Sequence, residues 1–409
     1  MNAEPDMKFH RRFDLPFDPI PAAAYTSQEY YNREIETIFK KDWLWLARDE
    51  EIPNAGDYKV KRLGFANTAI ILIRGKDGKV RGFHNICRHR GNKVITETGG
   101  EETFGSNRAA VVMCRFHGWV YNAEGKLVEV PEREKFPNCF SKDDNGLIPV
   151  PTDVWEGFIF INLNPTPEKT LTEFLGPVIE HYEGFPFGEL SEVRTYYAEI
   201  KSNWKVGMDA FMEGYHVPTI HAGSFPGLTN YWQGDITIQG DHRSIAFYTD
   251  GVNPETPVGT LANSIFRSSI ALERDTSFEL PKLVNPDRSP FWGFEQMTVF
   301  PQTLIHVGHG LWFTHVFWPV TQDTCLWEGK YFLPKPKTNS QRWAQHYATL
   351  LQRNAWLEDT ATMEDTQTAL KSGVLDKVNL QDEEIMLRHQ YEVIKRRVGS
   401  LEDVTGEIA

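Results

Sequence analysis

The chain has 409 residues, a net charge of −13 at pH 7, 40% hydrophobic residues and 24% charged residues. A chain of this length forms two or three domains with sizeable cores. The acidic total and the lack of Lys/Arg blocks argue against binding to nucleic acids or anionic membranes, because both need clustered positive charge. No window approaches the ~18 uninterrupted apolar residues of a membrane span, and the N-terminus lacks the apolar core of a secretory signal. We therefore expect a cytoplasmic protein.

The first half of the chain predicts a helix followed by a β domain. Residues 26–46 open with Thr26 and Glu29 at capping-box spacing and continue with apolar residues at helical intervals. From about residue 56, short alternating runs follow, joined by Gly-containing turns, and the last run, GFIFINL, ends at Leu163. This pattern is typical of a compact antiparallel β domain. We expect the polar segment GGEETFGSN inside it to be a surface loop.

The second half predicts a mixture of helices and strands. We expect helices over 171–182, 203–215, 340–370 and 381–397, and strands over 291–300 and 311–320. Because strands and helices occur in separate blocks, the fold class is α+β, with a domain built on an antiparallel sheet. The predicted organisation is an N-terminal helical segment (1–50) that packs on the second domain, a β domain (51–165) and the second domain (166–409).

Two Cys/His pairs carry the strongest chemical signal. They are Cys87 with His89 and Cys114 with His117, each on the tip of a predicted hairpin. Two thiolates and two imidazoles make a closed four-ligand metal site, and this donor set alone also suits structural zinc. The surrounding loops, CRHRG and CRFHGW, resemble those of Rieske proteins. In those proteins two Cys hold one iron and two His hold the other iron of a [2Fe–2S] cluster.

A second group of candidate ligands follows residue 203. Asp209, Glu213 and His216 recur at helical spacing and would share one face of a continuous helix. His221 would lie about 140° away from His216 on that helix. Pro218 disfavours helical geometry in the residue before it, so we expect the helix to break there and His221 to turn back towards His216.

A third ligand must come from elsewhere. The helix predicted over 340–370 carries four candidate acids: Glu358, Asp359, Glu364 and Asp365. On a helical wheel, only Asp359 falls within the apolar stripe of that helix. A buried acid costs several kcal/mol unless it is paired or binds a metal. His216, His221 and Asp359 would form the facial triad of non-haem iron(II) oxygenases, and a buried Asp satisfied by hydrogen bonds is the alternative.

Together these features make the chain resemble the α subunit of Rieske non-haem iron oxygenases, the family of aromatic-ring dioxygenases and O- and N-demethylases. The matching motifs occur in family order over nearly the whole length: CRHRG, CRFHGW, NWK…EGYHVPTIH, VFPQTLIH and the ED-x4-E-x2-Q helix. The resemblance implies an all-β Rieske domain and a catalytic domain of the helix-grip, Bet v1-like kind. It also implies two cofactors, a [2Fe–2S] Rieske cluster at Cys87, His89, Cys114 and His117, and a mononuclear Fe(II) at His216, His221 and Asp359.

The resemblance implies partners as well. In this bacterial family a separate NAD(P)H-dependent reductase, often with a ferredoxin, supplies electrons to a head-to-tail trimer (α3), with or without a β subunit (α3β3). By position, Glu213 would bridge His216 to His117 of a neighbouring subunit. Asp209 stands where ring dioxygenases often carry Asn, and it would either orient O₂ or protons or be a salt-bridged helix residue.

The substrate class stays open at this point. Aromatic residues make up 13% of the chain, which favours an apolar or aromatic substrate, as in the catabolism of aromatic hydrocarbons. The residues expected over the iron, or in the plain core, are Phe211, Met212, Trp292, Phe294, Trp312, Phe313 and Phe317. Glu213, where many ring dioxygenases carry Asp, also fits a monooxygenase or demethylase acting on a methoxyarene or a quaternary amine. Two interpretations without oxygenase activity are alternatives to a Rieske oxygenase: an electron-transfer protein and a zinc-binding protein.

Overall fold

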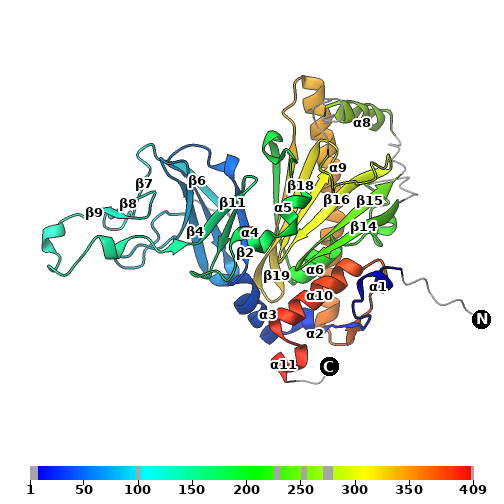
Figure 1. Cartoon of the computed structure of the whole chain (residues 1–409), viewed down its shortest axis with the longest axis horizontal. Coiled ribbons are helices and arrows are strands. Elements are labelled where there is room, and N and C mark those ends of the chain that lie inside the picture. Colours follow the sequence, from blue (N-terminus) through cyan, green and yellow to red (C-terminus); the bar gives the residue numbers. More distant parts are fainter. Residues whose placement is uncertain (1–7, 98–101, 225–230, 250–255, 270–279, 407–409) are drawn as a thin grey trace, which may run out of the picture. The chain divides into compact units, whose positions relative to one another are not determined.

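The computed structural model describes residues 8–97, 102–224, 231–249, 256–269 and 280–406. The chain divides into two compact units (Figure 1). One consists of Met1–Ile38 with Leu175–Ala409, and the other is Phe39–Phe174. Both units contain antiparallel sheets, and the long helices belong to the first, so the predicted α+β class is confirmed. In the described part of the chain, no helix has the length and apolar character needed to cross a bilayer.

The unit Phe39–Phe174 is built from three antiparallel sheets, as the alternating runs predict. The first has the order β10 (Pro149–Val150), β5 (Val80–His84), β4 (Thr68–Arg74), β3 (Asp57–Leu63) and β6 (Glu102–Ser106). The second has the order β11 (Thr152–Trp155), β12 (Phe158–Asn162) and β2 (Trp43–Arg48). The third is a meander of β7 (Val111–Met113), β8 (Val120–Asn122) and β9 (Leu127–Glu129).

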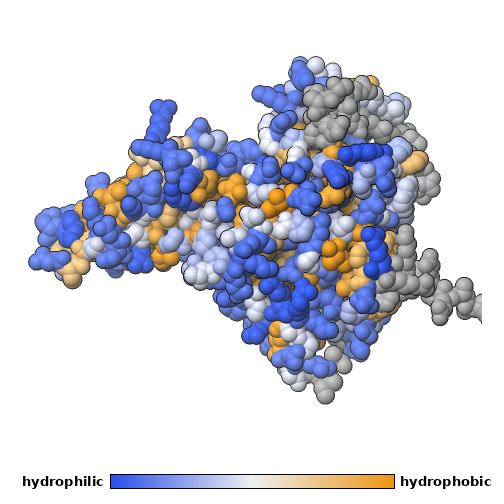
Figure 2. Space-filling model, in the orientation of Figure 1, coloured by the Kyte–Doolittle hydropathy of each residue, from blue (hydrophilic) through white to orange (hydrophobic). Residues whose placement is uncertain are grey.

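On the face drawn in Figure 2, hydrophilic residues predominate over the surface.

Two predictions for this unit are wrong. Residues 43–48 form strand β2, not the end of a helix. All six are buried, and all but Leu46, which lies at a register shift, pair with β12, so their run carries no helical period. The segment expected to be a surface loop contains β6 in its described part. Glu102 of β6 lies 2.8 Å from Lys59 Nζ and 2.9 Å from Lys61 Nζ, two lysines buried in β3. Pairing these charges explains why a polar segment joins the sheet.

The other unit contains a seven-stranded antiparallel sheet. Its order is β13 (Glu192–Ile200), β19 (Thr324–Leu333), β18 (Leu311–Thr321), β17 (Thr303–Gly308), β16 (Trp292–Val299), β15 (His242–Thr249) and β14 (Tyr231–Gln239). The long helix α9 (Asn339–Lys371) runs along the sheet (Figure 1), and it contacts β13 and the short helix α6 (Trp204–Ala210). Strands at 291–300 and 311–320 and the helix at 340–370 are therefore confirmed.

The remaining helices of this unit are shorter. They are α1 (Lys8–Phe13), α2 (Ala23–Thr26), α3 (Gln28–Glu34), α5 (Pro177–His181), α7 (Val217–Ile220), α8 (Pro257–Ser269), α10 (Ile385–Val398) and α11 (Leu401–Thr405). Ser27, not Thr26, caps α3 by accepting a hydrogen bond from the backbone N–H of Tyr30. The helix predicted over 171–182 is interrupted at Gly176, whose φ is +50°, between α4 (Leu171–Leu175) and α5.

Candidate metal centres

The two Cys/His loops share one backbone design. Cys87 accepts a hydrogen bond from Gly91 N at 3.0 Å and donates its own N–H to Asn92 O at 2.7 Å. Cys114 accepts from Gly118 N at 2.9 Å and donates to Trp119 O at 2.9 Å. In both loops the glycine four residues after the cysteine has a left-handed φ, +77° at Gly91 and +71° at Gly118. A side chain would strain this geometry, so each glycine is required for its turn.

The side chains of these loops converge in pairs. His89 Nδ1 lies 3.1 Å from His117 Nδ1, and the His89 ring stacks on Trp119 with centroids 4.9 Å apart. Cys87 and Cys114 are buried, whereas both histidines are half-buried. Burial opposes ionisation of Cys114, but backbone N–H groups of its own loop and the Asn92 amide still lower the pKa of this thiol. At Cys114 the thiolate form, which is the metal ligand, is thereby favoured, whereas burial raises the pKa of Cys87.

The grouping of the four loop ligands into two pairs distinguishes between a single zinc ion and a [2Fe–2S] cluster, the two possibilities for this donor set. Around one tetrahedral zinc, all four donor atoms would lie within roughly 4 Å of one another. Over the described ranges, only His216, His221 and Asp359 bring three donor atoms of His, Cys, Asp or Glu within 4.8 Å of one another. The four loop ligands therefore do not converge on one point, as a single zinc requires, and two separate pairs fit a two-iron cluster.

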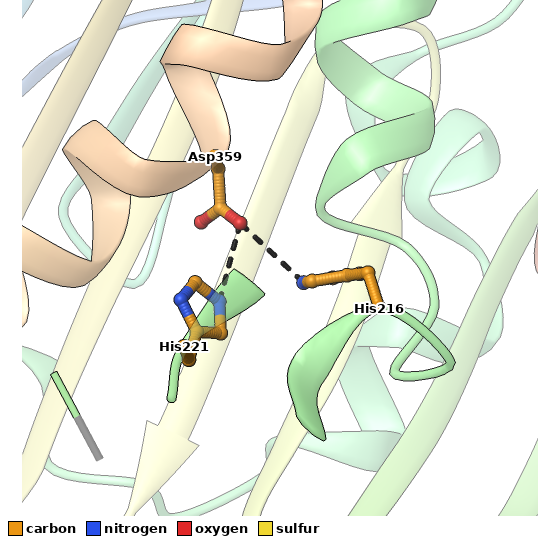
Figure 3. Close-up of side chains that lie close together, drawn as sticks. All are labelled: His216, His221 and Asp359. Carbon is orange, nitrogen blue, oxygen red and sulfur yellow. Dashed lines mark ion pairs between the residues drawn. The ribbon is translucent and has the colours of Figure 1, made fainter. Parts of the chain in front are cut away.

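The second group forms a three-residue centre (Figure 3). Asp359 projects from α9, and His216 and His221 flank α7, one before it and one after it. Asp359 Oδ1 lies 3.4 Å from His216 Nε2 and 3.2 Å from His221 Nε2. The imidazole nitrogens and the carboxylate oxygen thus face a common point between them.

Two further carboxylates orient the imidazoles of this centre. Glu213 Oε1 lies 2.5 Å from His216 Nδ1, and Glu358 Oε2 lies 2.9 Å from His221 Nδ1. A carboxylate at Nδ1 holds the proton there and leaves the lone pair on Nε2, the atom that faces Asp359. The nitrogen that a cation needs is therefore directed at the common point in both histidines.

The donor set fits a metal ion. Asp359 is 3% exposed, and its Oδ1 faces the Nε2 atoms of His216 and His221. Burial raises the pKa of Asp359, which records the cost of an ionised carboxylate at this place. A cation between the three groups would remove that cost, and two imidazoles with one carboxylate are the ligands of non-haem Fe(II) sites that keep positions open.

The local structure around the histidines differs from the prediction. Helix α6 ends at Ala210, so Glu213 and His216 lie in a turn beyond the helix that carries Asp209. The expected common helical face is therefore wrong. Pro218 does not end a helix but stands at its start, in the first turn of α7, where its missing N–H costs nothing. His221 still lies close to His216, with ring centroids 5.3 Å apart, because the two histidines are the cap residues at the two ends of the short helix α7.

The structure places Asp209 in a different environment from the triad. Its Oδ2 accepts a hydrogen bond from the Tyr25 hydroxyl at 2.7 Å. One turn earlier on α6, Lys205 forms a buried ion pair with Glu34 at 2.7 Å. Burial raises the pKa of Asp209 to about 7, although Tyr25 and Lys205 oppose this shift. Asp209 thus connects α6 to the N-terminal segment that contains α2 and α3.

The contact between Glu358 and His221 is one that the sequence does not predict. On a helical wheel Glu358 lies away from the apolar stripe that contains Asp359, and the sequence suggests it only as a possible ligand. In the structure its half-buried side chain reaches round the helix to His221. The sequence feature that could have indicated this contact is the adjacent pair Glu358-Asp359. Neighbouring residues on a helix point about 100° apart, so the two carboxylates can approach one imidazole from different sides.

The aromatic residues expected near the iron separate into two sets. Phe211 stacks on His315 with centroids 4.1 Å apart and also contacts Phe317. Trp312 packs instead on Phe332, with centroids 3.5 Å apart, in the core. It neighbours Phe313 in β18, so these two side chains lie on opposite faces of the sheet.

Comparison with known proteins agrees with these two centres. The family described as "Ring hydroxylating alpha subunit (catalytic domain)" matches residues 187–400, more than half of the chain, and "Rieske [2Fe-2S] domain" matches residues 42–146. The chain belongs to the ring-hydroxylating α subunits. It is a Rieske non-haem iron oxygenase α subunit, whose cofactors are a [2Fe–2S] cluster and a mononuclear iron at a His-His-Asp triad.

Individual relatives of this oxygenase subunit differ in what they act on. The carnitine monooxygenase oxygenase subunit of Escherichia coli (strain K12) is 30% identical over 54% of this chain and 58% of its own length. The large oxygenase component of the naphthalene 1,2-dioxygenase system of Ralstonia sp is 34% identical over 48% of this chain and 43% of its own length. The matches thus span about half the length of each relative, and the named substrates are properties of those proteins.

Solved structures share the fold. Naphthalene 1,2-dioxygenase from Rhodococcus sp., with indole bound, has a TM-score of 0.74 and 21% identity over 94% of this chain and 95% of that chain. A quaternary ammonium Rieske monooxygenase has a TM-score of 0.72 and 22% identity over 96% and 98%. At these identities the likeness establishes the architecture of both units and leaves the substrate open.

Proposed function

We propose that this α subunit hydroxylates an apolar or aromatic organic substrate with O₂. The observation that carries the proposal is the geometry of His216, His221 and Asp359, three donors that converge from two chain segments. When bound, the mononuclear iron supplies activation of O₂ and the cluster supplies single electrons. The chain's own part is to direct the three donors and to keep the site buried.

We assign the carboxylates beside the histidines to positioning. Glu213 and Glu358 each hold the proton of one imidazole at Nδ1. In a trimer, the proposed bridge from Glu213 to His117 of a neighbouring subunit would link the two metal centres. Cys87, His89, Cys114 and His117 hold the cluster in this proposal, within a domain assigned to 51–165, and the catalytic domain is assigned to 166–409 with 1–50 packed on it.

The proposal requires external electron donors. We infer a separate NAD(P)H-dependent reductase, with or without a ferredoxin, and a homotrimer that a β subunit accompanies or not. A cytoplasmic location, where NAD(P)H is made, goes with this requirement.

Monooxygenation of a quaternary amine, with loss of an alkyl group, is the second candidate. It is supported by the carnitine and choline monooxygenases among the relatives and by the glutamate at position 213. The iron ligands do not distinguish the two reactions, because both use the same donor set.

Substrate-dependent consumption of O₂ and NADH separates these candidates. The purified α subunit is assayed with a generic reductase and ferredoxin against aromatic acids, methoxyarenes and quaternary amines, and the products are identified. We expect O₂ uptake coupled to product with one of these classes. An enzyme that contains its full iron but shows no substrate-dependent O₂ uptake in any class would contradict the proposed function.

A further inference from the structure

A cluster of buried polar side chains lies on three neighbouring strands of the catalytic sheet. The strand cluster, as we call it, consists of Gln296 on β16, His306 on β17 and His315 on β18, all less than 4% exposed. Gln296 is paired in register with His306, and Gln296 Oε1 lies 3.1 Å from His306 Nε2. The rings of His306 and His315 meet edge to face, 5.1 Å apart.

One contact fixes the tautomer of His315. Trp327 Nε1 donates to His315 Nδ1 at 3.0 Å. Because an indole N–H only donates, Nδ1 must be the unprotonated nitrogen, and a neutral His315 carries its proton on Nε2. Burial keeps both histidines of the cluster neutral by lowering their pKa values, that of His306 to about 3.

Three polar atoms of the strand cluster have no hydrogen-bond partner within the residues that the structure describes: two donors, and the acceptor His306 Nδ1, whose ring donates from Nε2 to Gln296 Oε1. His315 Nε2 and Gln296 Nε2 are buried and make no hydrogen bond to any residue that the structure describes. A buried donor without an acceptor is unfavourable, and buried polar groups in proteins nearly always have a partner. Both donors therefore need a hydrogen-bond acceptor that is not one of the protein groups in the described residues.

The strand cluster lies beside the metal centre. The His315 ring stacks on Phe211, in the turn that leads to His216, and its centroid lies 4.8 Å from that of Trp356. Trp356 is buried on α9 one turn before Asp359. The cluster thus contacts both chain segments that carry the triad, but none of its members is a ligand.

We propose that His315 Nε2–H and the Gln296 amide bind an uncharged acceptor oxygen, an ether or a carbonyl, on an aromatic substrate of this oxygenase. The proposal rests on the proposed function and narrows its substrate class. The donors are neutral, so they would not offset the desolvation of a bound carboxylate. The positive ends of two N–H dipoles also disfavour a quaternary ammonium at this place. Phe211, Phe313 and Trp356, which contact the cluster, supply apolar surface for an arene.

Binding of two isosteric ligands tests the proposal. The holoenzyme, kept under nitrogen without a reductant, is titrated by equilibrium dialysis with 2-methoxynaphthalene and with 2-ethylnaphthalene, which differ in one oxygen. Without a hydrogen bond the ethyl compound should bind more tightly, because the ether must give up its water. We expect instead that the wild-type chain binds the methoxy compound about 10-fold more tightly, and that His315→Phe and Gln296→Leu reverse this preference.

Matched controls separate recognition from loss of packing. His242→Phe and Gln345→Leu remove a buried histidine and a buried glutamine that hydrogen-bond to the backbone, at Phe300 N and Pro334 O, and do not belong to the strand cluster. We expect these variants to keep the wild-type preference. A wild-type preference for the ethyl compound, or a preference unchanged in His315→Phe and Gln296→Leu, would overturn the proposal.

The experiment also distinguishes this proposal from the proposed function. Binding is measured without O₂ or electrons, so a selective subunit that shows no O₂ uptake with a competent reductase would refute only the proposed function. An active oxygenase with no preference between the two ligands would refute only the assignment of the strand cluster.

Discussion

The two metal centres of this chain are assembled in different ways. Each loop of the Cys/His centre supplies one thiol and one imidazole within a single turn, and a glycine with positive φ closes that turn. The triad instead joins a segment around His221 to one around Glu358, 137 residues further on. Local backbone hydrogen bonds position the first set of ligands, whereas packing of α9 positions the second.

The two centres also differ in the burial of their ligands and in the groups beside them. The loop histidines are half-buried, so an electron can reach or leave the cluster near the surface. Asp359 is buried and the histidines beside it carry carboxylates at Nδ1. A centre for electron transfer needs proximity to a partner, and a centre for chemistry needs a shielded site with oriented ligands. The contrast matches the division of labour in the proposed function.

The sharpest way to break this comparison is to remove one centre and observe the other. His216→Ala deletes one triad ligand, and we expect turnover to fall by at least about 10³-fold, because a site with two protein ligands no longer holds its metal. Bound iron should fall from about three to about two per chain, with the visible absorption of the cluster unchanged. Metal analysis and the absorption spectrum check both results.

The converse variant is Cys114→Ser. It should remove the cluster absorption and leave about one iron per chain, because no cluster ligand belongs to the triad unit. Circular dichroism controls for unfolding, since Cys114 is part of the core of its unit.

Loss of the cluster spectrum in His216→Ala would mean that the two centres are not separate.

The difference between the centres also explains how much the sequence could predict. The Cys/His pairs are contiguous motifs, and the alternating runs around them predict the strands that carry them. Asp359 could be selected from four acids because α9 is regular and its apolar stripe continues through Trp356, Met363 and Leu370. Regular periodicity is the information that a single sequence carries most reliably.

The remaining features depend on contacts between distant residues. The end of α6 at Ala210 is one of them: Gly214 donates to Gln233 Oε1 of β14 at 3.1 Å, and a side chain at Gly214 would collide with Tyr231. The partnership of Glu102 with two buried lysines of β3 is another. Neither leaves a local period or a turn signal, so neither could be read before the strands were placed together.

Glu358 offers a way to sharpen the comparison without removing a ligand. Glu358→Gln weakens the hydrogen bond that holds the His221 Nδ1 proton, and we expect iron affinity of the triad to fall about 10- to 100-fold. Competition with a chelator under nitrogen measures this, and the cluster should keep its iron. Asp365→Asn, an exposed substitution on the same helix, is the matched control. Equal iron affinity in the two variants would contradict the positioning role of Glu358.

The smallest expected effect concerns Asp209, which lies on the helix before the triad. Tyr25, Lys205, Arg243 and Glu384 are the groups that influence its charge. Its pKa rises from an ordinary value of 3.8 to about 7 in the folded chain. Between these values the folded chain holds a proton that the unfolded chain has lost, so this group makes stability fall as pH rises from about 4 to 7.

Asp209→Asn keeps a side-chain oxygen for the Tyr25 hydroxyl and removes the titration. The melting temperature of the variant should therefore exceed that of the wild type by an amount that grows from pH 5 to 7 and is constant above pH 8. The slope is at most about 1.4 kcal/mol per pH unit, which corresponds to a degree or two in a chain of this size. Because metal binding depends on pH in both proteins, only their difference reports on Asp209. If the difference in melting temperature between the variant and the wild type did not change between pH 5 and 8, Asp209 would not be the group that titrates. The hydrogen bond between Tyr25 and Asp209 would then be an ordinary structural contact.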